Sequence, residues 1–104
     1  MRLSALSVLT WNIRSANTTV NRHALSLLLH TEQPTVVVLT ETYLQRQMKP
    51  VPGYVSYQSP GALWQGVAVL VREEVASQPY RRKTWSRFGI AVLVQDVVVL
   101  GTYV

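Results

Sequence analysis

A strand–helix–strand pattern at the start of the chain constrains the fold more than any other feature of the sequence. Residues 3–13 are rich in Leu, Val, Trp and Ile, which indicates a buried strand. From Val20 onward, apolar residues recur at helical spacing until Pro34, which cannot continue a helix. Residues 35–40 (TVVVLT) are typical of a strand covered on both faces. The pattern therefore predicts two parallel neighbouring strands joined by a right-handed crossover helix.

The rest of the chain predicts further strands of a different kind. Residues 43–52 are polar with two prolines and indicate a loop, and strands are expected at residues 53–58, 66–72, 89–94 and 97–104. Only Gln95 and Asp96 separate the last two, so we expect a hairpin there. Tyr54 and Tyr57 lie on opposite faces of one strand, so we expect only one of them to be buried. The fold class is therefore α/β (α+β), a mixed sheet opened by a βαβ unit.

Composition limits the class of protein. The 104 residues are 48% apolar and 14% charged, against about 25% charged in typical soluble domains, which excludes a disordered tail. No apolar run approaches the roughly 18 residues of a membrane span, so we expect no membrane partner and an intracellular protein. Cysteine is absent, which excludes disulfides and thiolate zinc sites. The chain stops in an apolar strand, so we interpret residues 1–104 as a partial domain truncated at the C-terminus.

The charge balance favours a polyanionic partner. Ten Lys and Arg face five Asp and Glu, a net charge of +5. Half of the positive charge lies between residues 72 and 87, a region that also contains aromatic residues suited to stacking on bases. The alternative is that Trp85 and Phe88 anchor a core strand while the cations are simply solvated, and both interpretations stay open. The five cations of this region are Arg72, Arg81, Arg82, Lys83 and Arg87.

Two polar residues follow the two parallel strands of the opening unit. Asn12 ends the first strand and Glu41 follows the second. Because parallel neighbours present their carboxyl ends at one edge of a sheet, we expect these side chains to emerge side by side. A carboxylate and a carboxamide are hard oxygen ligands of the kind that Mg²⁺ selects. The alternative is that both are turn or helix-cap residues.

Four short motifs occur along the chain: LTWNIRS at 9–15, PTVVVLTETYL at 34–44, GVAVLVRE at 66–73 and VVVLGTYV at 97–104. In this order and spacing they resemble the endonuclease/exonuclease/phosphatase superfamily. The wording NIRS followed by LTETYL is most similar to the apurinic-type endonuclease domains of non-LTR retrotransposons. This resemblance implies the N-terminal half of a four-layer α/β/β/α sandwich.

The resemblance also implies roles for individual residues. Glu41 matches the metal-binding glutamate of the family, and Asn12 matches the asparagine that places the metal or the attacked phosphate, so it is both a catalytic and a metal-site candidate. Tyr103 matches a catalytic tyrosine that contacts the phosphate. The implied cofactor is Mg²⁺, with Mn²⁺ as an alternative ion. Candidate DNA contacts are Arg14, Arg81, Arg82, Lys83 and Arg87.

These matches predict a Mg²⁺-dependent DNA endonuclease domain of a retroelement polyprotein. The family's D-x-N motif, a later aspartate and its S-D-H motif are absent from the 104 residues. We therefore expect the parent domain to be an enzyme, and this chain alone to be inactive. Expected partners are DNA, the missing C-terminal half and a reverse transcriptase domain, in the nucleus if the element is eukaryotic. Two alternatives are a phosphatase, including a lipid-phosphate hydrolase, of the same superfamily, and a non-catalytic remnant that binds nucleic acid or a protein through its uncovered sheet face.

Overall fold

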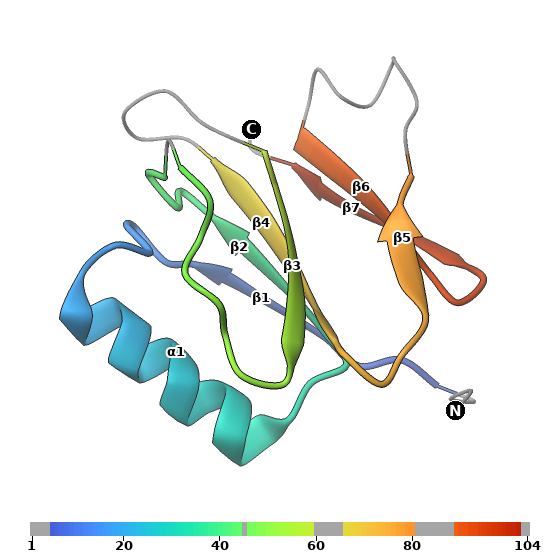
Figure 1. The fold of residues 1–104 in the computed structure, drawn as a ribbon, viewed down its shortest axis with the longest axis horizontal. Coiled ribbons are helices and arrows are strands. Elements are labelled where there is room, and N and C mark those ends of the chain that lie inside the picture. Colours follow the sequence, from blue (N-terminus) through green and yellow to red (C-terminus); the bar gives the residue numbers. More distant parts are fainter. Residues whose placement is uncertain (1–4, 45, 60–65, 81–88, 103–104) are drawn as a thin grey trace.

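The computed structural model describes residues 5–44, 46–59, 66–80 and 89–102. Within these ranges the chain forms one helix and seven strands. The strands lie in two sheets, and the helix packs on the outer face of the larger one (Figure 1). In chain order the elements are β1 (Val8–Asn12), α1 (Thr19–Glu32), β2 (Val36–Thr40), β3 (Tyr54–Ser59), β4 (Val67–Arg72), β5 (Ser77–Pro79), β6 (Gly89–Val94) and β7 (Val97–Thr102).

The larger sheet is mixed, as the sequence predicts. Its strand order is β1-β2-β4-β3, with β1 and β2 parallel and the other two pairs antiparallel. The smaller sheet, β5-β6-β7, is antiparallel throughout. The layers therefore follow one another as helix, sheet and sheet (Figure 1). This arrangement confirms the predicted α/β class and its opening βαβ unit.

Local chemistry sets both ends of α1. The hydroxyl of Thr18 accepts a hydrogen bond from the backbone N–H of Asn21 at 3.1 Å, which caps the first turn. At the other end Gln33 adopts a left-handed conformation with φ of 47°, and its N–H donates to the carbonyl of Leu29. Pro34 follows directly and prevents continuation. The helix therefore ends where it must for β2 to begin beside β1.

The central strands are covered on both faces because their side chains alternate between two cores. In β2, Val37 and Leu39 pack toward α1, while Val36 and Val38 pack toward the smaller sheet. All four are less than 10% exposed. This explains the unbroken apolar run in the sequence, because a strand buried on both faces has no polar positions.

The expectation that only one of Tyr54 and Tyr57 is buried is wrong, and β5 is a strand that the sequence does not predict. Tyr54 and Tyr57 do lie on opposite faces of β3, but each is half-buried, because Tyr54 packs against the helix-side core and Tyr57 against the other. The three-residue β5 carries no strand signal, since its residues are Ser, Gln and Pro. The hairpin at Gln95 and Asp96 is confirmed, with Gln95 taking the left-handed φ of 54° that a glycine would adopt more easily.

Candidate functional site

The backbones of β1 and β2 stay paired beyond the ends of both strands. The N–H of Ser15 donates to the carbonyl of Glu41 at 2.8 Å, and the N–H of Ala16 donates to that of Thr42 at 2.8 Å. Thr42, which is 1% exposed, in turn donates its N–H to the carbonyl of Gly66 at 3.2 Å, just before β4. The loops after β1 and β2 therefore share one rigid frame.

This frame brings Asn12 and Glu41 together. The Nδ2 of Asn12 donates a hydrogen bond to Oε2 of Glu41, and the hydroxyl of Tyr43 donates to Oε1 of the same carboxylate at 3.1 Å. Asn12 is exposed, whereas Glu41 and Tyr43 are half-buried. Each carboxylate oxygen thus has one donor, and the carboxylate is held in one orientation at the carboxyl edge of the parallel pair. Below, these two residues are called the Asn12–Glu41 pair.

Left-handed backbone conformations cluster around the pair. The φ angles are 49° at Arg14, 93° at Ser15, 54° at Glu41 and 56° at Tyr43. A side chain larger than glycine in this region costs about 1–3 kcal/mol, and such residues collect at functional sites. Glu41, which has this conformation directly after β2, is hydrogen bonded to Asn12.

Asn21 on α1 holds the loop after β1 in this conformation. Its Nδ2 donates to the carbonyl oxygens of Ile13 at 3.1 Å, Arg14 at 3.3 Å and Ser15 at 2.8 Å. Sequence reasoning missed both Asn21 and Tyr43. Tyr43 lies inside the LTETYL motif, but nothing in the sequence indicates that the Asn21 amide reaches back to three consecutive carbonyls.

The donor set of the pair fits a hard divalent cation. The Glu41 carboxylate keeps a lone pair on each oxygen beside its existing hydrogen bonds, and Oδ1 of Asn12 is a second hard oxygen. Mg²⁺ commonly takes one or two protein carboxylates and fills its remaining positions with water and phosphate. The described residues contain no cluster of three or more His, Cys, Asp or Glu side chains that could enclose an ion. The pair therefore fits an open site completed by water and a phosphate.

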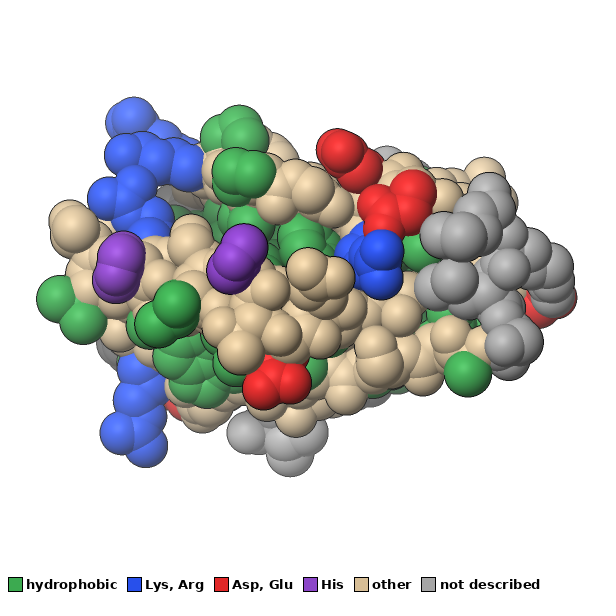
Figure 2. Space-filling view, turned by 90° about the horizontal axis from the view of Figure 1, so that it is seen from below, with side chains coloured by type: hydrophobic (Ala, Val, Ile, Leu, Met, Phe, Trp, Pro, Cys, Tyr) green, Lys and Arg blue, Asp and Glu red, His purple; other side chains and the backbone are tan. Residues whose placement is uncertain are grey.

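The other predicted site residues are placed only in part. Arg14 is exposed in the loop that follows β1. Both histidines of the chain, His23 and His30, are exposed on α1 (Figure 2). The remaining candidates lie outside the described residues: Tyr103, Arg81, Arg82, Lys83 and Arg87.

A family model for the endonuclease/exonuclease/phosphatase family matches residues 9–101. The chain belongs to this family. A search of curated proteins returns no match. The match between family model and sequence extends from β1 to β7, so it covers the Asn12–Glu41 pair and both sheets.

Solved structures of three other proteins are similar in fold to this chain. A 3′ phosphatase, NExo, from Neisseria, bound to a product DNA hairpin, is 25% identical with a TM-score of 0.73, over 95% of this chain and 41% of that one. An AP endonuclease from Archaeoglobus fulgidus is 21% identical with a TM-score of 0.73, over 96% and 41%. The AP endonuclease LMAP from Leishmania major is 15% identical with a TM-score of 0.73, over 95% and 40%. The chain thus spans about 40% of the length of these proteins and has the corresponding part of their fold.

No helix in the part of this chain that the structure describes is long and apolar enough to cross a membrane.

Proposed function

We propose that this chain is the N-terminal part of a Mg²⁺-dependent phosphodiesterase domain that cleaves DNA. The observation that carries the proposal is the Glu41 carboxylate, oriented at the edge of a parallel strand pair by donors on both of its oxygens. Open α/β sheets bind their ligands at the carboxyl edge of the strands, and this carboxylate is fixed at that edge. In this family a phosphate ester is the ligand that such a site would take.

In the proposed reaction Glu41 would hold the cation, while Asn12 orients the carboxylate and offers its amide oxygen to the same ion. Mg²⁺, when bound, stabilises the negative charge that develops on the phosphoryl oxygens. Tyr103 is proposed to contact the phosphate near the leaving oxygen. Activation of the attacking water by a general base contributes about 10²–10⁴-fold. In the part of the chain that the structure describes, no histidine is hydrogen bonded to the pair, so we propose that this chain alone is inactive.

DNA is the substrate that the chain's own features support. The net charge is +5, and the exposed Arg14 follows Asn12 by two residues in the loop after β1. The NIRS and LTETYL sequence motifs support the endonuclease of a non-LTR retroelement as the source of the domain. We further propose Arg81, Arg82, Lys83 and Arg87 as DNA contacts.

A phosphatase is the second candidate function. The similar Neisseria protein is described as a 3′ phosphatase, and its identity to this chain is 25% over the region that contains the pair. Both functions use a cation and a phosphate ester, and they differ in whether the bound phosphate is terminal. Affinity for duplex DNA with and without a terminal 3′-phosphate separates them: a preference of tenfold or more for the 3′-phosphate end supports the phosphatase.

The test of the proposed site is Mg²⁺-dependent stabilisation against unfolding. A ligand at about 100 times its Kd adds about 2.7 kcal/mol to the free energy of unfolding. We expect Mg²⁺ to raise the Tm of the chain and Glu41→Gln to abolish the rise. The matched control is Glu32→Gln, which removes an exposed carboxylate from the end of α1 and should respond to Mg²⁺ like the wild type. An equal response of Glu41→Gln and wild type contradicts the proposed function.

Nicking of supercoiled plasmid in the presence of Mg²⁺ tests the proposal that this chain alone is inactive. We expect no turnover from the purified 104-residue chain. Turnover that Glu41→Gln abolishes would show that the chain is active by itself and would overturn the predicted inactivity.

A further inference from the structure

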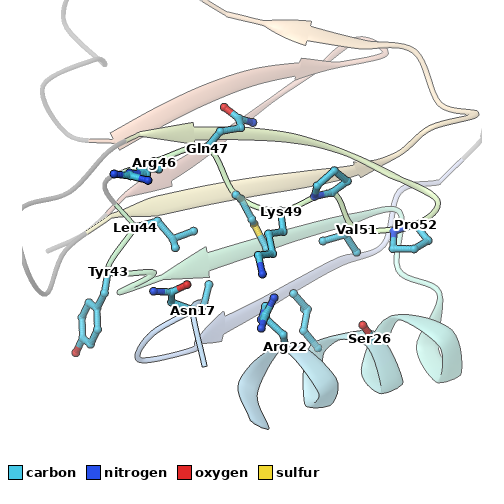
Figure 3. A pocket seen from close by; sticks show the side chains of 14 residues that line it. Asn17, Arg22, Ser26, Tyr43, Leu44, Arg46, Gln47, Lys49, Val51 and Pro52 are labelled. Atoms are coloured by element: carbon cyan, nitrogen blue, oxygen red, sulfur yellow. The ribbon is translucent and has the colours of Figure 1, made fainter. Parts of the chain in front are cut away.

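A pocket of about 710 Å³ lies next to the Asn12–Glu41 pair, between α1 and the segment that connects β2 to β3 (Figure 3). Tyr43 lines this pocket and also donates its hydroxyl hydrogen bond to Glu41 at 3.1 Å. The pocket therefore adjoins the candidate metal site, and the Tyr43 side chain is part of both.

Its lining contains three cations and no acid. Arg22 comes from α1, and Arg46 and Lys49 come from the connecting segment. None of the five acidic residues of the chain lines the pocket, and the nearby Glu41 is hydrogen bonded to Tyr43 of the lining. Arg72, which pairs with Glu74, lies outside the pocket. Figure 2 shows most Lys and Arg side chains of one face in two groups at the same end, with one further cation beside acidic side chains nearer the other end. Like charges around one hollow favour an anion.

Arg22 provides a second, independent indication of a ligand. Its Nε is buried and has no hydrogen-bond partner among the described residues. A buried donor without an acceptor is costly, so native structures normally satisfy it. In Figure 3 the Lys49 side chain extends toward the helix, and Arg22 projects from the opposite wall. An anion between them would supply the missing acceptor.

The wall that carries Arg46 and Lys49 is held in place by Gln58 of β3. Its Oε1 accepts from the N–H of Met48 at 2.6 Å, and its Nε2 donates to the carbonyl of Arg46 at 2.6 Å. Met48 is 5% exposed and packs in the helix-side core. The two cations therefore stand on a backbone that is fixed on both sides of Gln47.

We propose that this pocket binds one backbone phosphate of the nucleic acid, a neighbour of the phosphate at the Asn12–Glu41 pair. The inference rests on the proposed function and adds a second contact point on the same strand. The guanidinium of Arg22 would donate N–H groups to two phosphate oxygens, the fork geometry in which arginine binds phosphate. Lys49 adds a point charge from the opposite wall. Both contacts are independent of the base sequence.

The test is the salt dependence of duplex DNA binding by the 104-residue chain, measured by fluorescence anisotropy in EDTA. Loss of one phosphate contact lowers the slope of log K against log salt by about 0.9. We expect this decrease for the double variant Arg22→Met with Lys49→Met. Gln47→Met, which changes a neutral residue of the same lining and removes no charge, is the control and should keep the wild-type slope. A double variant whose slope matches that of Gln47→Met overturns the proposal.

Stability distinguishes a ligand site from a structural arginine. Arg22→Met keeps an unbranched stem and removes the unsatisfied donor, so we expect an unchanged or higher Tm together with weaker DNA binding. A lower Tm for Arg22→Met indicates a structural role and contradicts the proposal for this residue. Lys49→Gln, at an exposed position, carries the slope measurement if the double variant does not fold.

Two further measurements are needed. One distinguishes free phosphate from nucleic-acid phosphate as the ligand, and the other distinguishes failure of the pocket proposal from failure of the proposed cation site. Inorganic phosphate that raises the Tm of the wild type but not of the double variant, with an unchanged DNA slope, assigns the pocket to free anions and overturns the nucleic-acid assignment. Since binding is measured in EDTA, it does not depend on the cation site. A normal Mg²⁺ response with an unchanged slope therefore removes the pocket and leaves the proposed function standing, whereas the reverse pattern removes the cation site alone.

Discussion

The two faces of the larger sheet are packed by different kinds of side chain. On the side of the smaller sheet, the eight buried core residues among those that the structure describes are all valine, from β2, β4, β6 and the β4–β5 connection. On the side of α1, the buried core contains Leu, Ile, Met, Ala and one Val. Two sheets stack at nearly constant spacing, about 10 Å, so side chains of one short, stiff type fill the space. A helix and a loop leave gaps of varied depth, which need side chains of varied length.

The candidate site lies where the valine-lined packing ends. In β1, Leu9 and Trp11 pack against the helix-side core, and Val8, Thr10 and Asn12 point to the other side. These three residues are exposed, with Val8 52% accessible, because β1 is the edge strand that the smaller sheet does not cover. One sheet face therefore serves both as core and, at its uncovered edge, as the surface that carries Asn12.

Truncations on the two faces test the comparison most strongly. Leu39 and Val69 are both 0% exposed, one facing α1 and the other the smaller sheet. We expect Leu39→Ala to lower the free energy of unfolding by about 3–4 kcal/mol, and Val69→Ala by about 2 kcal/mol, in urea unfolding. Equal losses of unfolding free energy for the two variants would mean that the smaller sheet relaxes less around the cavity left at Val69 than α1 and its loop relax around the cavity left at Leu39.

Adding a methyl group between the sheets should have a smaller effect. A Cβ at Gly101 of β7 would lie 2.7 Å from Cγ1 of Val67 and 3.2 Å from Cγ1 of Val38. We expect Gly101→Ala to cost about 2 kcal/mol, because side chains on both sheets must shift. The double variant Gly101→Ala with Val67→Ala should cost less than the sum of the two single variants. Strict additivity would contradict close packing at this point.

The loop after β1 gives a smaller change that reaches the site. Asn21→Ala removes the donor shared by the carbonyls of Ile13, Arg14 and Ser15. We expect a loss of about 1 kcal/mol in the free energy of unfolding and a weaker Mg²⁺-induced rise in Tm. Asn17→Ala, in the same loop, is the control. A variant that loses stability but keeps the full Mg²⁺ response would separate the loop from the site.

The smallest effect is a pH dependence on the helix side. Burial raises the pKa of the Tyr54 phenol, whose hydroxyl donates to the carbonyl of Pro34 at 2.6 Å. Because the folded state holds this proton more tightly than the unfolded state, the contribution is complete below pH 10 and is lost as the pH rises through the raised pKa. Thermal unfolding between pH 9 and 11 should show a shallower alkaline decline for Tyr54→Phe than for wild type. Tyr57→Phe, on the valine side, is the matched control.

The sequence predicts the faces of the central strand better than the edges of the sheets. An unbroken run at residues 35–40 requires cover on both sides, and parallel pairing of its neighbour brings Asn12 next to Glu41. The sequence does not indicate that β1 is an edge strand or that Ser77–Pro79 pairs with β6, because both depend on partners far along the chain. Likewise, nothing local indicates that Asn21 binds the loop after β1 or that Gln58 binds the segment before β3. These are side-chain contacts that exist only after the layers have assembled.

The left-handed residues around the site have a consequence for selection experiments. Glycine adopts such angles freely, so at Arg14, Ser15, Glu41 and Tyr43 it would relieve the backbone. A library randomised at these four codons and sorted only for thermal resistance should therefore become enriched in glycine. The same library sorted for retention of a divalent ion should keep glutamate at 41. Divergence between the two populations would identify, codon by codon, which side chains are present for chemistry rather than for folding.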